Sequence, residues 1–221
     1  MLLECLTREH GRLGVVARGV RSSSTRSARS QLQRAQLEPF QPLLLNLQLR
    51  GELAALRGVE TTGIPLRLLG DAGLAGLYLN ELVVRLTGRQ DPHPVLFDAY
   101  ARTLPRLASG DSLAWQLRRF ERDLLEAIGY ALQLEFDAEH GEPLDPRAHY
   151  RYQAEQGARL CAAGEADAIC GADLLALAGD RLPDAHGLRA LRRMMRKVIR
   201  FHLGGAELRA WQVLAMAMSR S

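Results

Sequence analysis

The spacing of apolar residues changes once along this chain, near residue 68. Before that point, short apolar runs are interrupted by Gly, Pro and Ser about every ten residues, which is typical of strands joined by turns. Leu13 to Ala17, Leu37 to Leu47 and Gly51 to Glu60 are predicted strands. Pro39 and Pro42 should kink the entry to the middle one, since proline cannot donate to a sheet.

After residue 68 the apolar period becomes that of an α-helix. A predicted helix that Gly88 can end carries the stripe Leu74, Leu77, Tyr78, Leu82 and Leu86. Pro94 to Leu107 is a second predicted helix. A third begins at the capping pair Asp111-Ser112 and stops at Gly129, with Leu113, Leu117, Phe120, Leu124 and Ile128 on one face.

The rest of the chain is predicted to be mostly helical. Residues 137–153 form an irregular or hairpin segment, and helices follow over Ala172 to Ala178, Ala185 to Leu203 and Ala206 to Met218. The pattern predicts an α+β chain with a β-module over residues 1–67 and a helical domain over residues 68–221.

Charge is segregated along the chain. The formal net charge is only +4, but residues 8–34 hold seven arginines against one acid, and residues 188–201 hold six basic residues and no acid. Residues 120–184 are acidic, with fourteen acids against five arginines. Two basic poles indicate a polyanionic partner. The alternative is that the arginine bias, 28 of the 29 basic residues, reflects genomic base composition.

The N-terminal arginines are candidate DNA contacts, because guanidinium groups match phosphate oxygens without reading sequence. Residues 21–30 contain five Ser, one Thr and three Arg, which predicts a mobile basic loop. No aromatic residue lies between positions 8 and 34 to stack on bases, so backbone binding and annealing are favoured over base readout. The alternative is a solvated loop. The candidates are Arg8, Arg12, Arg18, Arg21, Arg26, Arg29 and Arg34.

Two later helices offer an acidic-peptide pocket or a second DNA surface. In the helix from Ala185, apolar residues face inward and basic residues outward, although a solvated face would look the same. On the third helix Trp115 lies with arginines opposite the apolar stripe, and this face can instead pack on a neighbouring domain. Met194 and Met195 are expected in the core. The candidates are Arg118, Arg119, Arg193, Arg196 and Arg200.

Several classes of protein are excluded or disfavoured. Apolar runs such as Leu43 to Leu45 fall far short of the roughly 18 residues that span a bilayer, and the N-terminus has no signal-peptide pattern. Cys5, Cys161 and Cys170 are too few and too scattered for a disulfide framework or a zinc site. No phosphate-binding glycine loop, nucleophile elbow or His-Glu-x-x-His motif is present. We expect a cytoplasmic, non-enzymatic protein without metal or cofactor.

Several collinear blocks resemble bacterial RecO proteins. They are Thr7 to Arg12, Val15 to Gly19, Leu37 to Leu45, Arg50 to Leu53, Leu77 to Leu82, Leu96 to Tyr100, Leu117 to Glu121 with Gly129-Tyr130, and His202 to Gly205. The resemblance covers nearly the whole chain. It implies an oligonucleotide-binding (OB) barrel followed by a helical domain, in agreement with the change of period.

The resemblance also implies a function in DNA repair and recombination after DNA damage. RecO proteins bind single- and double-stranded DNA and anneal complementary strands. They engage the acidic tail of single-strand-binding protein and, with RecR, help to load RecA. Nucleoid association in the cytoplasm is therefore expected. A second hypothesis is an interaction scaffold whose helical domain recruits partners while an incomplete barrel binds DNA weakly.

Three features depart from the family pattern. RecO chains usually begin earlier with an opening strand, so either the start of this sequence is misassigned or its barrel lacks that strand. The four-cysteine zinc module of some members is absent. After Gly204-Gly205, where the family tends to place basic residues, this chain reads Ala206-Glu207-Leu208.

Overall fold

The structure, a computed structural model, describes residues 1–18 and 34–211. The chain divides into two compact units. The sheet unit comprises residues 1–76 and 87–109, and the helical unit comprises residues 77–86 and the chain from residue 110 onward. Helix α2 (Gly70–Leu86) contributes to both. None of the described helices is long and apolar enough to cross a membrane.

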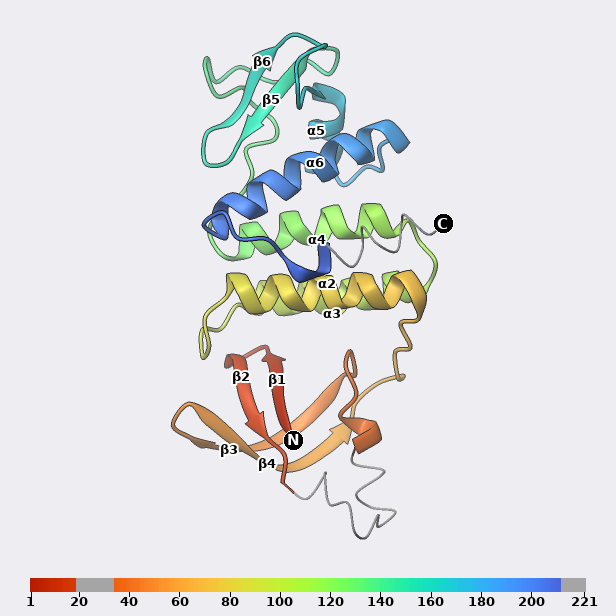
Figure 1. Ribbon diagram of the computed structural model, residues 1–221, viewed down its shortest axis with the longest axis vertical. Coiled ribbons are helices and arrows are strands. Elements are labelled where there is room, and N and C mark those ends of the chain that lie inside the picture. The colour runs from red at the N-terminus through yellow and green to blue at the C-terminus, as the bar shows by residue number, and fades with distance from the viewer. Residues whose placement is uncertain (19–33, 212–221) are drawn as a thin grey trace. The chain divides into compact units, whose positions relative to one another are not determined.

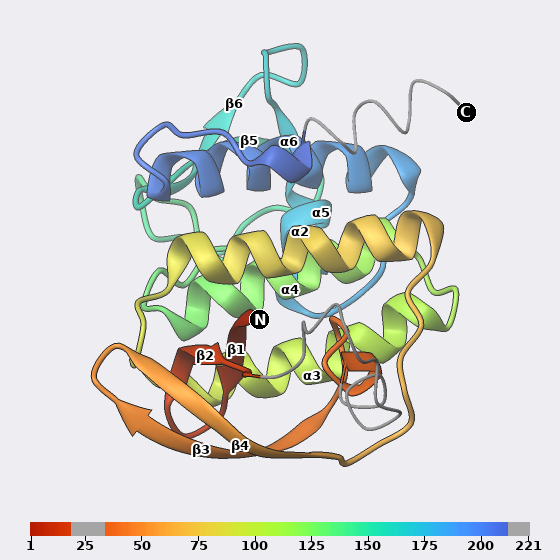
Figure 2. The ribbon, with the colours of Figure 1, turned by 60° about the horizontal axis from the view of Figure 1, so that its bottom comes forward.

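In its described residues, the sheet unit contains four strands in the order β1-β2-β4-β3 (Figures 1 and 2). They are β1 (Leu2–Thr7), β2 (Gly11–Val16), β3 (Leu43–Arg50) and β4 (Leu53–Thr61). Both hairpins are antiparallel, and β2 pairs with β4 in parallel, which joins the hairpins into one mixed sheet. The α+β prediction with an N-terminal β-module is confirmed.

The predicted set of strands needs two corrections. Strand β1 was not predicted, and β3 begins at Leu43 rather than Leu37. The late start of β3 follows from Pro42, which lacks the N–H that a ladder needs, and from Phe40, whose φ of 67° interrupts extended backbone. The core of this sheet is small, with Leu13, Val15 and Ala54 at its centre.

Helix α3 (Pro94–Ala108) belongs to the sheet unit. The segment before α3 lies against the β1-β2 turn, where the Gln90 N–H donates to the Arg12 carbonyl at 3.0 Å. Gly11 in that turn has a φ of 63°, and a Cβ there would lie 2.1 Å from the Asp91 carbonyl oxygen. Glycine is therefore required where the strand turn meets this segment.

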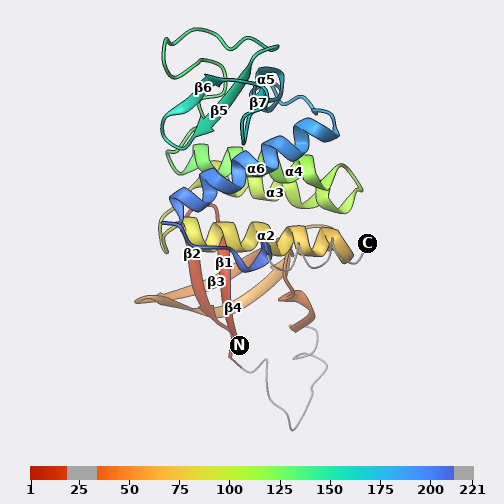
Figure 3. The ribbon, with the colours of Figure 1, turned by 45° about the horizontal axis from the view of Figure 1, so that its top comes forward.

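The helical unit contains a small antiparallel sheet in the order β6-β5-β7, together with helices α4, α5 and α6 (Figure 3). The strands are β5 (His149–Gln153), β6 (Gly157–Cys161) and β7 (Ile169–Cys170), and the helices are α4 (Leu113–Ala127), α5 (Gly171–Ala178) and α6 (Ala185–His202). The predicted Ser112 cap is confirmed, since its hydroxyl accepts from the Trp115 N–H. The predicted irregular or hairpin segment over residues 137–153 is confirmed in part: it ends in β5, the first strand of the β5-β6 hairpin, whereas β6 lies beyond it and was not predicted.

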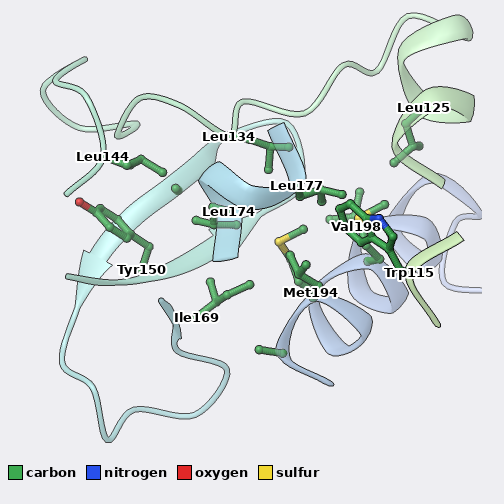
Figure 4. Packing of buried hydrophobic residues seen from close by; sticks show 14 residues of the cluster. Trp115, Leu125, Leu134, Leu144, Tyr150, Ile169, Leu174, Leu177, Met194 and Val198 are labelled. Carbon is green, nitrogen blue, oxygen red and sulfur yellow. The ribbon is translucent and has the colours of Figure 1, made fainter. Parts of the chain in front are cut away.

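One apolar cluster joins the small sheet to α4, α5 and α6 (Figure 4). Tyr150 of β5 lies at the hairpin end of the cluster, and Trp115 of α4 lies among residues of α5 and α6. Met194 and Met195 are buried, as predicted. Their flexible thioether side chains fill the space between helix and sheet.

The apolar stripe predicted for α2 is confirmed in part: Tyr78 and Leu82 are buried, and Leu74 and Leu86 are partly buried. Leu77 is 51% exposed, and the buried face carries Ala75, Tyr78, Leu79, Leu82 and Val83. A Cβ added to Gly76 would lie 2.8 Å from the Phe40 ring, so small residues on this face make room for a large neighbour. The spacing of the leucines alone could not reveal that small residues form part of the buried face.

The last predicted helix is only partly described. Helical backbone begins at Arg209 rather than Ala206, and the predicted continuation to Met218 lies outside the described residues after position 211.

We expect Leu191→Ala to destabilise the helical unit by about 2–5 kcal/mol, because the fully buried Leu191 side chain would leave a cavity. The matched control Leu182→Ala removes the same atoms from an exposed side chain and should change stability by less than about 0.5 kcal/mol. Urea denaturation followed by circular dichroism measures both. Equal effects would contradict the assigned core.

Candidate nucleic-acid interface

Helix α6 presents six cations on one exposed face. Asp184 caps its N-terminus by accepting from the Gly187 N–H at 2.8 Å. From there, apolar residues recur with the helical period and are buried in the cluster shared with α4 and α5. The residues between them point to solvent, and the exposed cations are Arg189, Arg192, Arg193, Arg196, Lys197 and Arg200.

Fewer acids than cations lie along this face. Asp167 pairs with Lys197, and Glu207 pairs with Arg196 at 2.9 Å and with Arg200 at 3.5 Å. Asp184 lies at the N-terminal end, where the Gly187 N–H and nearby charges, including that of Arg189, lower the pKa of its carboxyl. Helix α6 itself contains no acid from Ala185 to His202, so the face that it presents is predominantly positive.

Arg196 also has a structural role. Its guanidinium lies 4.7 Å from the centroid of the buried Trp211 ring, which is a cation–π contact. Glu81 of α2 holds the same segment by accepting from the N–H groups of Arg209 and Ala210. The segment that follows Gly204-Gly205 is thus fixed to the helical unit, and Arg196 contributes to that fixation.

The expected exposure of Arg118 is wrong. Arg118 is buried and pairs with the fully buried Glu121, which also accepts from the Tyr78 hydroxyl at 2.6 Å. Burial raises the pKa of Glu121, while the Arg118 charge and the Tyr78 hydroxyl oppose that shift. Arg118 therefore neutralises a buried carboxylate and is not a surface cation.

Trp115 and Arg119 follow the alternative in which this helix face packs on its neighbours. Trp115 is buried, and Arg119 forks onto Asp180 at the end of α5, with a contact of 2.6 Å from Nε. Burial tends to raise the pKa of Asp180, but the hydrogen bond and charge of Arg119, together with Arg122, lower it overall. Arg119 is thereby committed to a partner within its own unit.

The N-terminal candidates separate into four groups. Arg12 is only 12% exposed, pairs with Glu4 and donates to the Thr87 carbonyl at 2.8 Å. Arg8 is half exposed and pairs with Asp98 at 3.1 Å. Arg18 and Arg34 are exposed on either side of residues 19–33. Arg21, Arg26 and Arg29 lie outside the described residues.

Glu4 explains why Arg12 is held in the sheet unit. Burial tends to raise the pKa of Glu4, but hydrogen bonds and charges from Arg89 and Arg12 lower it overall. In the β1-β2 register Arg12 stands opposite Leu6, which places Glu4 at a diagonal position on the same face. Because β1 was not predicted, the sequence pattern could not reveal this pair.

Comparison with known proteins identifies the family. The family model for the recombination protein O N-terminal domain matches residues 1–65, and the model for its C-terminal domain matches residues 69–212. This chain belongs to the recombination protein O (RecO) family. The resemblance expected from the sequence blocks is therefore confirmed. The two matches meet close to the change of apolar period.

Curated RecO relatives match over nearly their whole length. The DNA repair protein RecO of Xanthomonas euvesicatoria is 45% identical over 219 residues, which cover 97% of this chain and 89% of the relative. Those of Stenotrophomonas maltophilia strains R551-3 and K279a are 47% identical over 218 residues and 45% identical over 224 residues. The alignment with the K279a protein covers 100% of this chain and 91% of the relative.

The small sheet of this RecO chain brings together residues that are distant in the sequence. His149 on the central strand pairs with Cys161 on one side and Cys170 on the other. The two cysteines are two strand spacings apart, roughly 9.6 Å, which is too far for a disulfide. Among the described residues, no group of three or more His, Cys, Asp or Glu side chains could hold a metal ion.

The sequence also missed an aromatic cluster at the C-terminal end of α6. Tyr130, which follows the left-handed Gly129, stacks on His202 with ring centroids 4.2 Å apart. Phe201 meets His202 edge-on at 5.4 Å. The only sequence signals were the glycine stop after α4 and the position of Phe201-His202 at a helix end, and neither suggests that the rings meet.

We expect Arg118→Met to destabilise the chain by about 3–5 kcal/mol, because it leaves Glu121 buried without its cation. The control Arg193→Met removes an exposed arginine and should cost less than about 1 kcal/mol. Chemical denaturation of both variants measures the difference. A stable Arg118→Met protein with impaired DNA affinity would instead restore Arg118 as a binding residue.

Proposed function

We propose that this RecO-family chain is a non-enzymatic mediator of recombinational DNA repair that binds single- and double-stranded DNA and anneals complementary strands. The observation that carries the proposal is the α6 face, where six cations are exposed on a helix that contains no acid. The names of its curated relatives, DNA repair protein RecO, support the same role.

The α6 face suits a phosphate backbone rather than a particular sequence. Cations that replace the counterions of DNA gain affinity from ion release, and this gain does not depend on the bases. Lys197 and Arg200 are more than half exposed, so their head groups can reach a bound strand. Such contacts leave the base edges of a bound strand open for pairing.

Annealing follows from the same electrostatics. Two strands repel each other through their phosphates, and a cationic surface that holds both lowers that repulsion while complementary bases find their register. Base pairing forms no covalent bond, so the reaction requires no catalytic residue. On this basis we propose that the chain acts without enzymatic activity.

The sheet unit supplies a second set of contacts in this proposal. Arg18 and Arg34 are exposed at the two ends of residues 19–33, a segment that also contains Arg21, Arg26 and Arg29. Arg12 is excluded from this set by its pairing with Glu4. We propose that Arg18 and Arg34 contact phosphates directly.

We also propose the protein partners that the family resemblance implies. They are RecR, the acidic tail of single-strand-binding protein and, indirectly, RecA, with the chain acting at the nucleoid. Arg193 and Arg200 are exposed cations that an acidic tail could contact.

We expect the Gln triple variant of Arg189, Arg193 and Lys197 to bind single-stranded DNA more weakly and with less salt dependence. The slope of log affinity against log salt should fall by about 0.7 for each phosphate that the protein no longer neutralises, or about 2 in all. Fluorescence anisotropy at several salt concentrations measures the slope, and a strand-annealing assay should slow in parallel.

The matched control is the Gln triple variant of Arg85, Arg159 and Arg181, three exposed arginines outside α6. It removes the same charge and should leave the slope nearly unchanged. Equal slopes for both triple variants would show that only net charge matters. Undetectable DNA binding by the wild-type chain, with binding of an acidic peptide retained, would favour the interaction scaffold instead.

A further inference from the structure

Three aromatic rings, those of Tyr130, Phe201 and His202, meet at the C-terminal end of α6. Tyr130 and Phe201 remain 46% and 53% exposed. His202 lies between them, tilted by 32° against Tyr130 and nearly perpendicular to Phe201. Single exposed apolar side chains are ordinary, but here two exposed rings both contact a third, partly buried ring.

The cations of α6 lead directly to this cluster. In an α-helix, residues four apart lie one above the other, so Lys197 is one turn before Phe201 and Arg193 is two turns before it. Successive turns are about 5.4 Å apart. Arg200 is the residue next to Phe201 and is also exposed. The exposed cations of α6 thus form a row that ends at the exposed rings of Tyr130 and Phe201.

The surroundings of His202 keep the cluster apolar. Burial lowers the pKa of His202, although the nearby charge of Glu155 acts in the opposite direction. The imidazole is therefore neutral at neutral pH and presents a flat ring rather than a charge. Glu155 acts on His202, and Glu207 pairs with Arg200 at the same end of the helix.

We propose that Tyr130, Phe201 and His202 form a stacking site for unpaired bases of a single strand whose phosphates follow the cations of α6. Aromatic rings beside a cationic track are the combination by which proteins hold single strands without sequence preference, because every base has a π-face. The inference rests on the proposed DNA binding and adds to it a contact with bases.

The site has a functional consequence. Bases inside a duplex already stack on one another, so the rings gain little from double-stranded DNA. The site therefore favours single strands, whereas the cations alone bind both forms. A strand held by phosphates and a few bases keeps its other bases free to pair, as annealing requires.

An acidic peptide with an apolar end is the competing occupant of a cationic and aromatic surface. A nucleic acid is favoured because the cations continue along α6 for several turns beyond the rings, from Arg200 back to Arg189, which exceeds what one peptide carboxylate needs. Peptide binding that depends on the rings, with DNA binding independent of them, would overturn the assignment.

The test compares a thymidine oligonucleotide with an abasic strand of the same length and charge. The wild-type chain should bind the thymidine strand more tightly, by roughly 5- to 100-fold. The double variant Tyr130→Ala/Phe201→Ala should lower affinity for the thymidine strand toward the abasic value. Its affinity for the abasic strand and for duplex DNA should stay unchanged. Leu160→Ala, an exposed apolar residue elsewhere in the same unit, is the control.

The outcomes separate this inference from the proposed function. Equal wild-type affinity for thymidine and abasic strands overturns the stacking site but leaves DNA binding standing. Absence of binding to any strand overturns both. Because Tyr130 lies closer to His202 (4.2 Å between ring centroids) than Phe201 does (5.4 Å), Phe201→Ala is the less disruptive change and is also tested alone, and Phe201→Trp should restore the preference for bases. Failure of Phe201→Trp to restore it, in a chain with an unchanged circular dichroism spectrum, counts against stacking.

Discussion

The burial of one face of α6 is the constraint on which the helical unit depends. Leu191, Met195 and Ile199 are completely buried, and the cluster around them joins α4, α5 and the small sheet. The cations cannot enter that apolar interior without partners, so they must point outward. The same packing that folds this unit therefore sets the direction of its positive face.

The arginines of the chain have different structural roles. Arg118 is buried as the counterion of Glu121, and Arg12 ties a strand to the segment before α3 through Glu4 and the Thr87 carbonyl. Arg196 lies on an indole ring. An arginine that is paired with a carboxylate and shielded from solvent is poorly placed to bind a phosphate. The cations of α6 differ because they are exposed and lie on a helix that contains no acid.

The sequence predicts elements well where a periodic pattern faces one core, as in α3 and α6. The prediction is less accurate where the packing partner of an element is unknown. Small residues form part of the buried face of α2, and the Glu4–Arg12 pair depends on strand β1, which was not predicted. Charge runs alone could not separate Arg118 from Arg193, because a buried ion pair and a solvated cation look alike in sequence. The stacked rings of Tyr130 and His202 come from positions 72 residues apart, so only the fold shows them.

The most direct measurement is photochemical crosslinking of a single strand containing 5-iodouracil, followed by identification of the modified residues by mass spectrometry. The account predicts adducts on Tyr130 and Phe201 and on peptides from α6, since the base must lie against the rings while the backbone follows the cations. Adducts confined to other parts of the chain, with none on α6 or on Tyr130, would contradict it.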